Sequence, residues 1–523
     1  MIKRLLPFYA LLSWFTFATL PSISQQSGSL TALAQPAQQK QNGMSYAAWW
    51  PGEYSKPYAD HSLANLANTG ATWISLIVTQ YQDSVYTTDI YAAPGTPTDA
   101  DLVHAIAQAH RYGLKVMLKP HVDLANDPSH WRGQIGEYYS ESDWAHWFSS
   151  YQKFINHYAE LAQANHAEQF CAGTELSETE LREKNWRIII AGIRQHYSGS
   201  LTYAANHGDE NRLNWWDAVD IIGVDAYYPL TGKNDPTVDE LKTAWQPIVT
   251  SLAALASARS KSIIFTEIGY RSQDGTNQHP WDWQIGGTID LQEQRDAYQA
   301  AFESFYNQAW FSGFYWWSWD TNPTLGGPCN MDYTPYDKPA EQVVRAWYGA
   351  RAAIRPVIPV PDPQRIYDVY TDALAPGWSD GSWDASVNLA SSNPVYSGVA
   401  AISASAQPWG ALSLHYPDLD TSPYYWLEFY LQEPSIEQAI RLFIDDEYTA
   451  APVDICRYVD GAVQPNSWMH VRVPLLDLAA ADRKIQNVVV KNYSDQPAQF
   501  SIDDMRFMGA QWTVYLPAIE PGQ

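Results

Sequence analysis

The feature that most constrains the fold is an alternation of short apolar runs with amphipathic segments between residues 43 and 351. Eight of these runs resemble strands, and they lie at 44–49, 72–78, 115–120, 169–174, 201–206, 221–227, 262–267 and 313–319. Most of the intervals carry the apolar spacing of helices. The pattern predicts a (β/α)8 TIM barrel, a fold of roughly 250 residues. A doubly wound open sheet is the alternative, disfavoured because no glycine-rich loop follows an early strand.

The pattern changes after the barrel and predicts a second domain. Residues 352–364 are rich in proline, which is typical of a stiff linker. From 365 to 510, short alternating runs separated by turn residues indicate an antiparallel, jelly-roll-like β-sandwich. Residues 511–523 form the expected C-terminal tail. The fold class is therefore an α/β barrel followed by an all-β domain.

The N-terminus has the form of an export signal. Lys3 and Arg4 precede an apolar run that extends from Leu5 to about Leu20. We expect residues 1–34 to be a signal peptide and polar residues 35–42 to be a disordered spacer. The protein would then be secreted and extracellular, with no membrane association after cleavage, and a retained N-terminal anchor is the alternative.

The net charge excludes one class of partner. The chain has 57 acidic and 32 basic residues, a formal charge of −25. Such a surface repels phosphate backbones, so we expect no nucleic acid partner. A neutral polysaccharide meets no such repulsion. The 24 Trp and 34 Tyr offer flat apolar faces for sugar rings, although large β-rich cores are also rich in aromatic residues.

The cysteines argue against a metal centre. Cys171, Cys329 and Cys456 lie far apart and show no paired spacing. We therefore expect no catalytic metal and at most one disulfide. Cys171 falls within a predicted strand, where it would act as a small buried apolar residue. We expect the protein to be a monomer.

Two glutamates end strands on opposite sides of the predicted barrel. Glu175 follows the fourth strand and Glu267 ends the seventh. Catalytic groups of TIM barrels lie at the carboxyl ends of strands. A glycosidase needs two carboxylates beside the scissile bond, and a separation of about 5–5.5 Å gives retention of configuration. Each glutamate alone could be a solvated residue or a helix cap, but the pair indicates catalysis.

Several motifs resemble those of one glycosidase family. The segments FCAGTELSETE, LKPHVDL, IIGVDAYYPL, IFTEIGY and GFYWWSW resemble glycoside hydrolase family 113, the β-mannanases of clan A, over residues 43–350. The resemblance implies Glu175 as acid/base, Glu267 as nucleophile, and Tyr227 as a hydrogen-bond donor to the nucleophile. Thr174 departs from the wider clan, which usually has asparagine before the acid/base.

Other strand ends supply candidate substrate-binding residues. Trp317 and Trp319 lie two apart on the eighth strand and should share a face. We favour Trp317 as a platform for the sugar, although both could be core residues. Lys119 lies near the end of the third strand and His121 follows it, and both are expected to contact substrate rather than a metal. Asn206 ends the fifth strand and is expected to line the cleft.

The C-terminal domain resembles jelly-roll carbohydrate-binding modules. The segments APGWSDGSWDASVNL, SGVAAISAS and FSIDDMRF carry this resemblance. Trp378, Trp383 and Trp409 are candidate sugar platforms, each equally compatible with a core position. Asp503 and Asp504 could help to hold a structural calcium ion or could be solvated acids at a strand end.

The predicted function is hydrolysis of β-1,4-linked polysaccharide, foremost mannan, by double displacement without a catalytic cofactor. A retaining β-glycanase acting on glucan or xylan is the nearest alternative. A non-catalytic polysaccharide-binding protein is a second alternative, disfavoured because a binding protein needs no paired carboxylates.

Overall fold

The computed structural model describes residues 40–350, 359–433, 440–447, 452–460 and 463–511. The expected signal peptide, most of the expected spacer, residues 352–358 of the expected linker and the tail from 512 lie outside the described residues. The chain divides into a unit of residues 1–39 and a unit of residues 40–523. Among the described helices, none is long and apolar enough to span a membrane.

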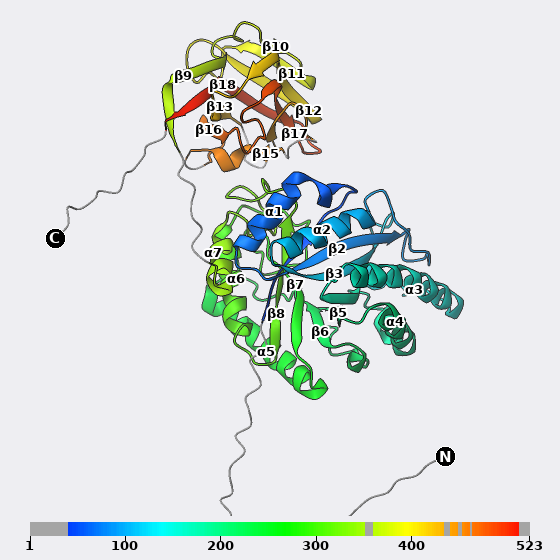
Figure 1. Ribbon diagram of the computed structural model, residues 1–523. Helices are drawn as coiled ribbons and strands as arrows, with labels where there is room; N and C mark the ends of the chain where they lie inside the picture. The colour runs from blue at the N-terminus through cyan, green and yellow to red at the C-terminus, as the bar shows by residue number, and fades with distance from the viewer. Residues whose placement is uncertain (1–39, 351–358, 434–439, 448–451, 461–462, 512–523) are drawn as a thin grey trace, which may run out of the picture. The chain divides into compact units, whose positions relative to one another are not determined.

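The N-terminal, larger part of the described chain is a closed barrel of eight parallel strands, as predicted, with each strand paired to the next in sequence and β8 to β1 (Figure 1). The strands are β1 Gln41–Ala47, β2 Trp73–Gln82, β3 Lys115–Leu124, β4 Gln169–Thr174, β5 Ser200–Asn206, β6 Ile221–Asp225, β7 Ile263–Ile268 and β8 Phe311–Asp320. The barrel therefore begins at Gln41, inside the expected spacer.

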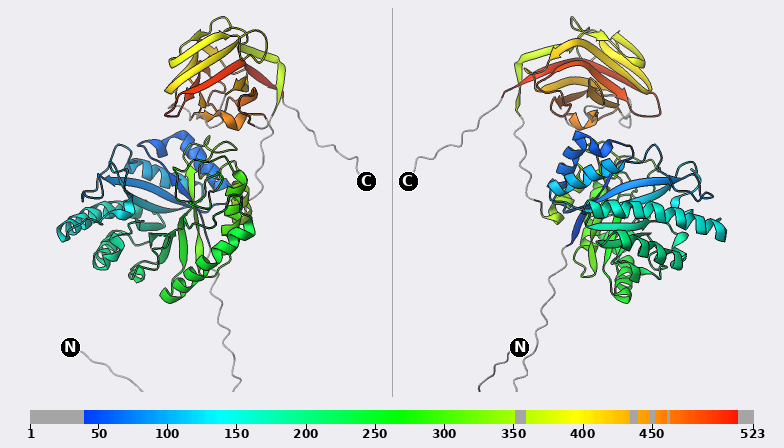
Figure 2. Two further views of the ribbon diagram at one scale, coloured as in Figure 1. Left: turned by 180° about the vertical axis from the view of Figure 1, so that it is seen from behind. Right: turned by 45° about the vertical axis from the view of Figure 1, so that its right-hand side comes forward.

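Helices cover the outside of the barrel, as the two further views in Figure 2 show. They are α1 Pro57–Asn68, α2 Asp99–Arg111, α3 Glu141–Ala164, α4 Glu183–His196, α5 Val238–Arg259, α6 Leu291–Phe305 and α7 Pro339–Tyr348. Thr98, Ser140 and Thr237 begin α2, α3 and α5 with capping boxes, which satisfy free backbone N–H groups. Short 3-10 turns include Glu53–Ser55, Arg132–Gln134, Thr179–Leu181 and Trp216–Ala218.

Strand alternation determines which side chains enter the barrel. Met117, Cys171, Ala204, Ile264 and Tyr315 form one buried cluster, to which β3, β4, β5, β7 and β8 each contribute. Successive residues of a strand point to opposite faces. Residues two and four positions beyond Met117 on β3 therefore share its inward face, nearer the carboxyl end of the barrel. The apolar cluster fills the barrel interior away from the carboxyl ends of the strands, and polar side chains occupy the interior at the carboxyl ends.

The sequence-based expectation for the eighth strand is wrong in one respect, because Trp317 and Trp319 do not share a face. The pairing of β1 with β8 shifts register between Met44 and Tyr46, which interrupts the alternation. Trp319 is buried and its Nε1 donates to the Ser62 carbonyl of α1 at 3.1 Å. Trp319 is therefore a packing residue between barrel and helix, and Trp317 alone is partly exposed.

The C-terminal, smaller part of the described chain is an antiparallel β-domain. Its strands are β9 Val360–Tyr370, β10 Ser379–Asp380, β11 Trp383–Ser391, β12 Ala401–Asp420, β13 Trp426–Gln432, β14 Ile440–Ile444, β15 Val453–Asp454, β16 Met469–Pro474, β17 Lys484–Asn492 and β18 Ala498–Gln511. Their order is β15-β14-β17-β12-β18-β13-β16, with β10 and β11 beside β12 and β9 beside β18. A further 3-10 turn spans Ile455–Tyr458.

The linker is shorter than the proline content predicts. Val360, Pro361 and Asp362 already pair with Gln511, Ala510 and Gly509 of β18. These prolines fit because β9 lies at a sheet edge, where a strand tolerates missing N–H donors. The β-domain therefore includes the residues from Val360 onward, at the end of the predicted linker.

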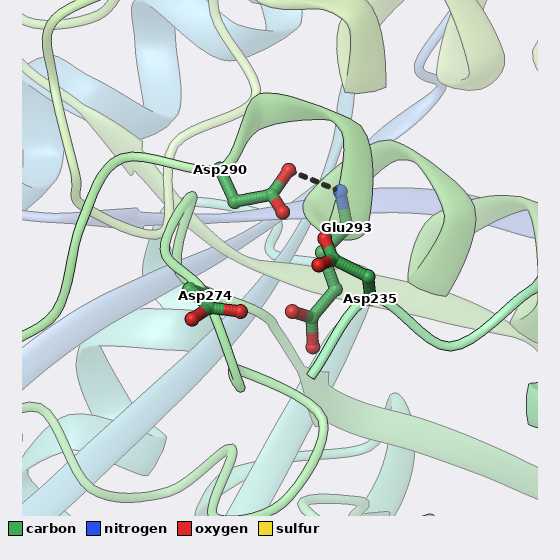
Figure 3. Close-up of side chains that lie close together, drawn as sticks. All are labelled: Asp235, Asp274, Asp290 and Glu293. Carbon is green, nitrogen blue, oxygen red and sulfur yellow. Dashed lines mark hydrogen bonds between the residues drawn. The ribbon is translucent and has the colours of Figure 1, made fainter. Parts of the chain in front are cut away.

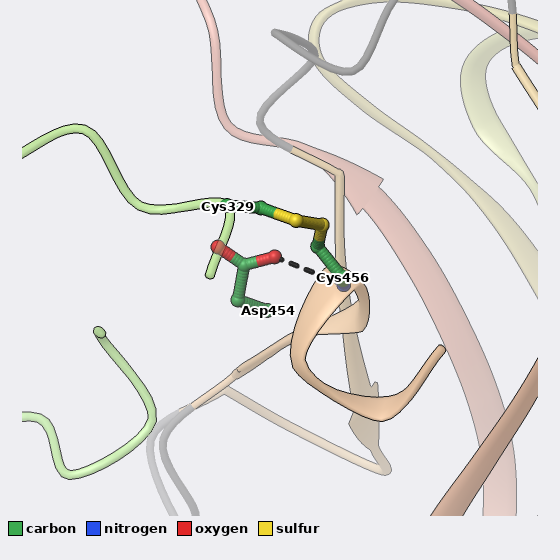
Figure 4. The surroundings of a disulfide bond; sticks show 3 residues. All are labelled: Cys329, Asp454 and Cys456. Carbon is green, nitrogen blue, oxygen red and sulfur yellow. Dashed lines mark hydrogen bonds between the residues drawn. A yellow bond between two sulfur atoms is a disulfide. The ribbon is translucent and has the colours of Figure 1, made fainter. Parts of the chain in front are cut away.

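Covalent and polar contacts join the β-domain to the loop after β8. Cys329 of that loop forms a disulfide with Cys456 of the β-domain (Figure 4), while Cys171 is free and buried. The Arg457 side chain donates to the Pro323 carbonyl at 2.7 Å and lies over the Tyr336 ring. The sequence allowed one disulfide, and its position links the two domains.

Candidate active site

The two glutamates predicted to be catalytic lie at the carboxyl end of the barrel, one after β4 and one on β7. Glu175 has a φ of +54°, a left-handed conformation that is rare for a residue other than glycine. Its backbone N–H donates to the Ala204 carbonyl of β5 at 2.9 Å, which holds this conformation. Backbone outliers of this kind concentrate at functional sites.

Glu267 is held on both carboxylate oxygens. The Tyr227 hydroxyl, just after β6, donates to Oε2 at 2.9 Å. Lys119 Nζ contacts Oε1, and His121 Nε2 lies 3.6 Å from the same oxygen. The side chain of Glu267 is only 7% exposed, so these contacts replace most of its hydration. The carboxylate is therefore oriented and its charge compensated before any substrate binds.

Lys119 lies deeper in the barrel than its place near a strand end predicts. It is fully buried, and its Nζ lies 3.1 Å from both carboxylate oxygens of Asp225. Burial opposes the charged form, but the Asp225 and Glu267 carboxylates raise the pKa of Lys119. Because its ammonium is occupied by these two carboxylates, Lys119 supports Glu267 and lies out of reach of a sugar.

Arg132 belongs to the same network, although no pattern in the sequence indicates it. Arg132 Nη2 donates to Asp123 Oδ2 at 2.8 Å and Nη1 donates to His121 Nδ1 at 3.0 Å. A ring nitrogen that accepts from Arg132 carries no proton, so the Nε2 of a neutral His121 carries the hydrogen and faces Glu267. Burial, together with Lys119 and Arg132, holds the pKa of His121 well below its usual value.

The surroundings of Glu175 favour its protonated form, in contrast to the cation that contacts Glu267. Its side chain is 16% exposed, and Arg132 Nη1 lies 3.9 Å from its Oε2. Burial raises the pKa of Glu175 to about 7, an effect that Arg132 opposes and the Glu267 charge reinforces. Near neutral pH the Glu175 carboxyl can therefore hold a proton, while the Glu267 carboxylate is bound by Lys119 and Tyr227. This asymmetry is what a general acid and a nucleophile require.

Aromatic side chains surround the strand ends. Trp317 lies 6.3 Å from Trp49, measured between ring centroids, and Trp49 is 47% exposed. Trp281 stacks on His207 at 5.3 Å and is also exposed. These rings come from loops after β1, β5, β7 and from β8 itself, so flat apolar surfaces gather at the catalytic end. Loops carry no periodicity, so no sequence pattern indicates Trp49 or Trp281.

Two further predicted positions lie at strand ends. Asn206 is the last residue of β5 and is partly exposed, and its backbone carbonyl accepts from the Asp209 N–H at 3.0 Å. Thr174, immediately before Glu175, is buried, and its Oγ1 makes no hydrogen bond among the described residues. The Thr174 hydroxyl therefore keeps a free hydrogen-bonding capacity beside the acid/base candidate.

Outside this site, four carboxylates could hold a cation. Asp235, Asp274, Asp290 and Glu293 offer oxygens within 4.8 Å of one another (Figure 3). Several of these oxygens already serve the protein, since Glu293 accepts from the Asn277 side chain at 2.7 Å and Asp290 caps α6. A side-chain hydrogen bond with Asp290 is the main cause that raises the pKa of Asp235, and repulsion from the Asp290 charge adds to it.

The acids proposed for calcium in the β-domain are engaged by protein donors. Asp503 is buried, and its Oδ2 accepts from the N–H groups of Tyr396 and Ser397 at 2.9 and 3.1 Å. Asp504 Oδ2 accepts from the Ser397 hydroxyl at 2.9 Å. These contacts fasten the loop before β12 to β18, and a calcium ion there stays a prediction.

Comparison with known proteins identifies the family of the barrel. The family model described as Glycoside Hydrolase Family 113 matches residues 44–338, more than half of the chain. A solved GH113 β-1,4-mannanase, determined as a complex, is 30% identical with a TM-score of 0.54, over 60% of this chain and 100% of that one. The GH113 β-mannanase AaManA from Alicyclobacillus acidocaldarius, in complex with ManMIm, is 33% identical with a TM-score of 0.54, over 60% and 98%. No curated protein matches the chain. The chain belongs to Glycoside Hydrolase Family 113, and the barrel is its glycoside hydrolase domain.

Proposed function

We propose that this glycoside hydrolase cleaves β-1,4-linked mannan with retention of configuration, using Glu267 as nucleophile and Glu175 as acid/base. The observation that carries the proposal is the electrostatic difference between the two glutamates. Burial raises the pKa of Glu175 to about 7, while Glu267 is bound by Lys119 and Tyr227. Hydrolysis by this family needs no cofactor.

The proposed reaction has two displacements. In the first, a Glu267 oxygen attacks the anomeric carbon while the Glu175 carboxyl protonates the departing glycosidic oxygen. A covalent glycosyl ester on Glu267 results. In the second, the Glu175 carboxylate removes a proton from water, and this water releases the sugar from Glu267 with a second inversion. Overall retention follows because two inversions occur at the same carbon.

The supporting residues act through the two glutamates. As the Glu267 charge is consumed by bond formation, Lys119 remains paired with Asp225, so the buried cation is never left without a partner. Tyr227 fixes the direction of the carboxylate, and the neutral His121 leaves the local charge unchanged. Trp317 is suited to lie beneath the sugar because its ring is partly exposed beside these groups.

The choice of mannan is supported by the two solved family members, whose descriptions name β-mannanase activity. We propose from the N-terminal sequence that the enzyme is secreted and extracellular. A monomeric state is a separate proposal. A polysaccharide is the proposed partner, because a chain of net charge −25 disfavours nucleic acid.

A polysaccharide panel assayed for reducing ends tests the substrate. We expect release from mannan and glucomannan, and much less from xylan or cellulose. Proton NMR of the first product tests the stereochemistry, with the β-anomer expected to appear before mutarotation. Faster release from xylan or β-glucan would replace mannan as substrate. Initial α-anomer would show inversion and reject the double displacement.

A further inference from the structure

We propose that one face of the β-domain, carrying Trp383 and Trp409, binds a neutral β-1,4-linked hexopyranose polysaccharide. We call it the Trp383 face and define it by Trp383, Trp409, Ala411, Lys491 and Arg441, on strands β11, β12, β17 and β14. The identity of the polymer rests on the proposed function of the barrel. The face itself is argued from the β-domain alone.

The structure separates the three tryptophans that the sequence left equivalent. Trp378 is buried in the main core of the β-domain and lies 5.3 Å from the Tyr416 ring. In contrast, Trp383 is 39% exposed and Trp409 is 56% exposed. Neither indole belongs to the buried core clusters of the described β-domain. Trp378 is therefore a core residue, and Trp383 and Trp409 are the ones available to a ligand.

Backbone register places the exposed indoles on the same side of the sheet. Trp383 pairs directly with Ala411, and Ala411 pairs directly with Lys491 on its other side. Directly paired residues of antiparallel strands have side chains on one face. Trp409 lies 5.9 Å from Lys491 Nζ, measured to the ring centroid, and so belongs to that face. The small Ala411 lies between the larger side chains.

Both indoles are presented by an irregular stretch of the β11–β12 pair. Between the pairs Trp383–Ala411 and Ala385–Ala406, β12 contains four residues, 407–410, where β11 contains only Asp384. Asp384 and Trp409 both have positive φ, +47° and +67°. A left-handed conformation is a genuine outlier for a side chain as bulky as tryptophan. Bulges re-aim side chains near binding sites, which accounts for keeping this conformation.

The glycine next to Trp409 makes this arrangement possible. A Cβ atom on Gly410 would lie 2.2 Å from the Asp384 carbonyl oxygen. Only glycine therefore lets the two strands approach at the point where both tryptophans leave the sheet.

A polar network fixes the surroundings of Trp409. Lys491 Nζ lies 2.9 Å from both carboxylate oxygens of Glu447, and the Tyr493 hydroxyl contacts the same carboxylate. The Tyr493 ring lies 5.8 Å from Trp409, and the Arg441 guanidinium lies over that tyrosine. Lys491 is neutralised by Glu447, and Arg441 pairs directly with Asp454 on the neighbouring strand, so the network carries little excess charge. Such a surface is suited to a neutral hydroxylated ligand rather than to an ion.

The ligand class follows from this combination. A hexopyranose ring has an apolar C–H face that packs on indole and equatorial hydroxyls that hydrogen-bond to the polar rim. The disulfide between Cys329 and Cys456 holds the β-domain to the loop after β8, so any chain bound at this face stays near the barrel. Retention of an insoluble polymer near the catalytic domain raises its effective concentration.

The test measures binding separately from hydrolysis. The full-length Glu267→Ala protein is mixed with insoluble mannan, and the unbound protein is measured over a range of polymer concentrations. The Trp383→Ala and Trp409→Ala changes are added singly and together. Tyr396→Ala is the matched control, because Tyr396 is a 43% exposed aromatic residue that stacks on Tyr430 of β13, outside the Trp383 face. Near-ultraviolet circular dichroism checks that each variant is folded.

We expect the double variant to bind insoluble mannan at least about tenfold more weakly. This is the loss expected when tryptophan side chains that a ligand covers are removed. The single variants should lie between, and Tyr396→Ala should bind normally. With Glu267 intact, the double variant should hydrolyse soluble manno-oligosaccharides at the unaltered rate.

Three results would overturn the inference: full binding by folded single and double variants, loss of binding in Tyr396→Ala instead, or no binding of the parent to mannan, cellulose or xylan. Failure of the proposed function would appear differently, as an intact enzyme that hydrolyses nothing in the panel, and the binding measurement would still be decisive. If only cellulose is retained, the polymer bound at the face is a glucan and not a mannan. If only xylan, a pentose polymer, is retained, the hexopyranose assignment is wrong.

Discussion

Replacing Arg132 should move the alkaline limb of the pH–rate profile upward. The Arg132 guanidinium lies 3.9 Å from Glu175 Oε2, and its charge favours the carboxylate. At this distance two unit charges interact by about 4 kcal/mol at an effective dielectric constant of 20. That is an upper limit of about 3 pKa units at 1.36 kcal/mol per unit, and opposite charges at such distances shift pKa values by roughly 1–3 units.

The sign follows from the role of Glu175. As general acid it must be protonated, so kcat/KM falls as pH rises through its pKa of about 7. Removing the cation in Arg132→Gln raises this pKa, and the limb should move to roughly pH 8–10. The released Asp123 charge acts in the same direction, since Asp123 also raises the pKa of Glu175.

The assay is kcat/KM for a soluble manno-oligosaccharide between pH 4 and 10, with thermal unfolding measured at each end. Arg132→Lys is the control, because it keeps the charge and should leave the limb within about half a unit. Glu175→Gln should abolish the limb. An unmoved or downward-shifted limb in folded Arg132→Gln would refute the assignment of this limb to Glu175.

Three further outcomes are expected. Azide should rescue Glu267→Ala with inverted product and Glu175→Ala with retained product, and chromatography of the glycosyl azides would expose reversed roles. Lys119→Met should lower the free energy of unfolding in urea by about 3–5 kcal/mol, since it leaves Asp225 and Glu267 as buried carboxylates without a cation. Lys119→Arg should recover part of this loss. A Lys119→Met protein as stable as the unaltered protein would contradict the buried ion network. Cys329→Ser should destabilise by up to about 5 kcal/mol, because the disulfide spans a separation of 127 residues, and an unchanged thermal midpoint under oxidising conditions would count against the bond.

The barrel was predictable because its information is local. Each strand is a short apolar run, buried on both faces, and along each helix apolar residues recur every three to four positions. Both patterns can therefore be recognised within a short window of sequence. The rule that catalytic groups lie at strand ends then selected Glu175 and Glu267 without any knowledge of distances. The family resemblance added the roles that spacing alone left undefined.

Other features depended on residues that are far apart in the chain. Lys119 appeared to be a substrate contact, since a strand-end lysine gives no sign that Asp225 and Glu267 occupy its ammonium across the barrel. Arg132 lies in a loop without periodicity, so nothing in its neighbourhood indicated that it contacts His121 and Asp123. Charge networks form between side chains brought together by closure of the barrel, and such pairing is invisible to a local pattern.

The sequence by itself determined the two-domain architecture, the two catalytic candidates and the limit of one disulfide. Only the tertiary structure decided that Trp319 and Trp378 are core residues while Trp383 and Trp409 are exposed. The physical reason is that alternation predicts a face only while the strand register is unbroken. The shift between β1 and β8 and the irregular pairing of β11 with β12 both break that register. Tryptophans on either side of such a break look alike in the local sequence. Only their three-dimensional surroundings show which ones pack in the core and which ones are exposed to a ligand.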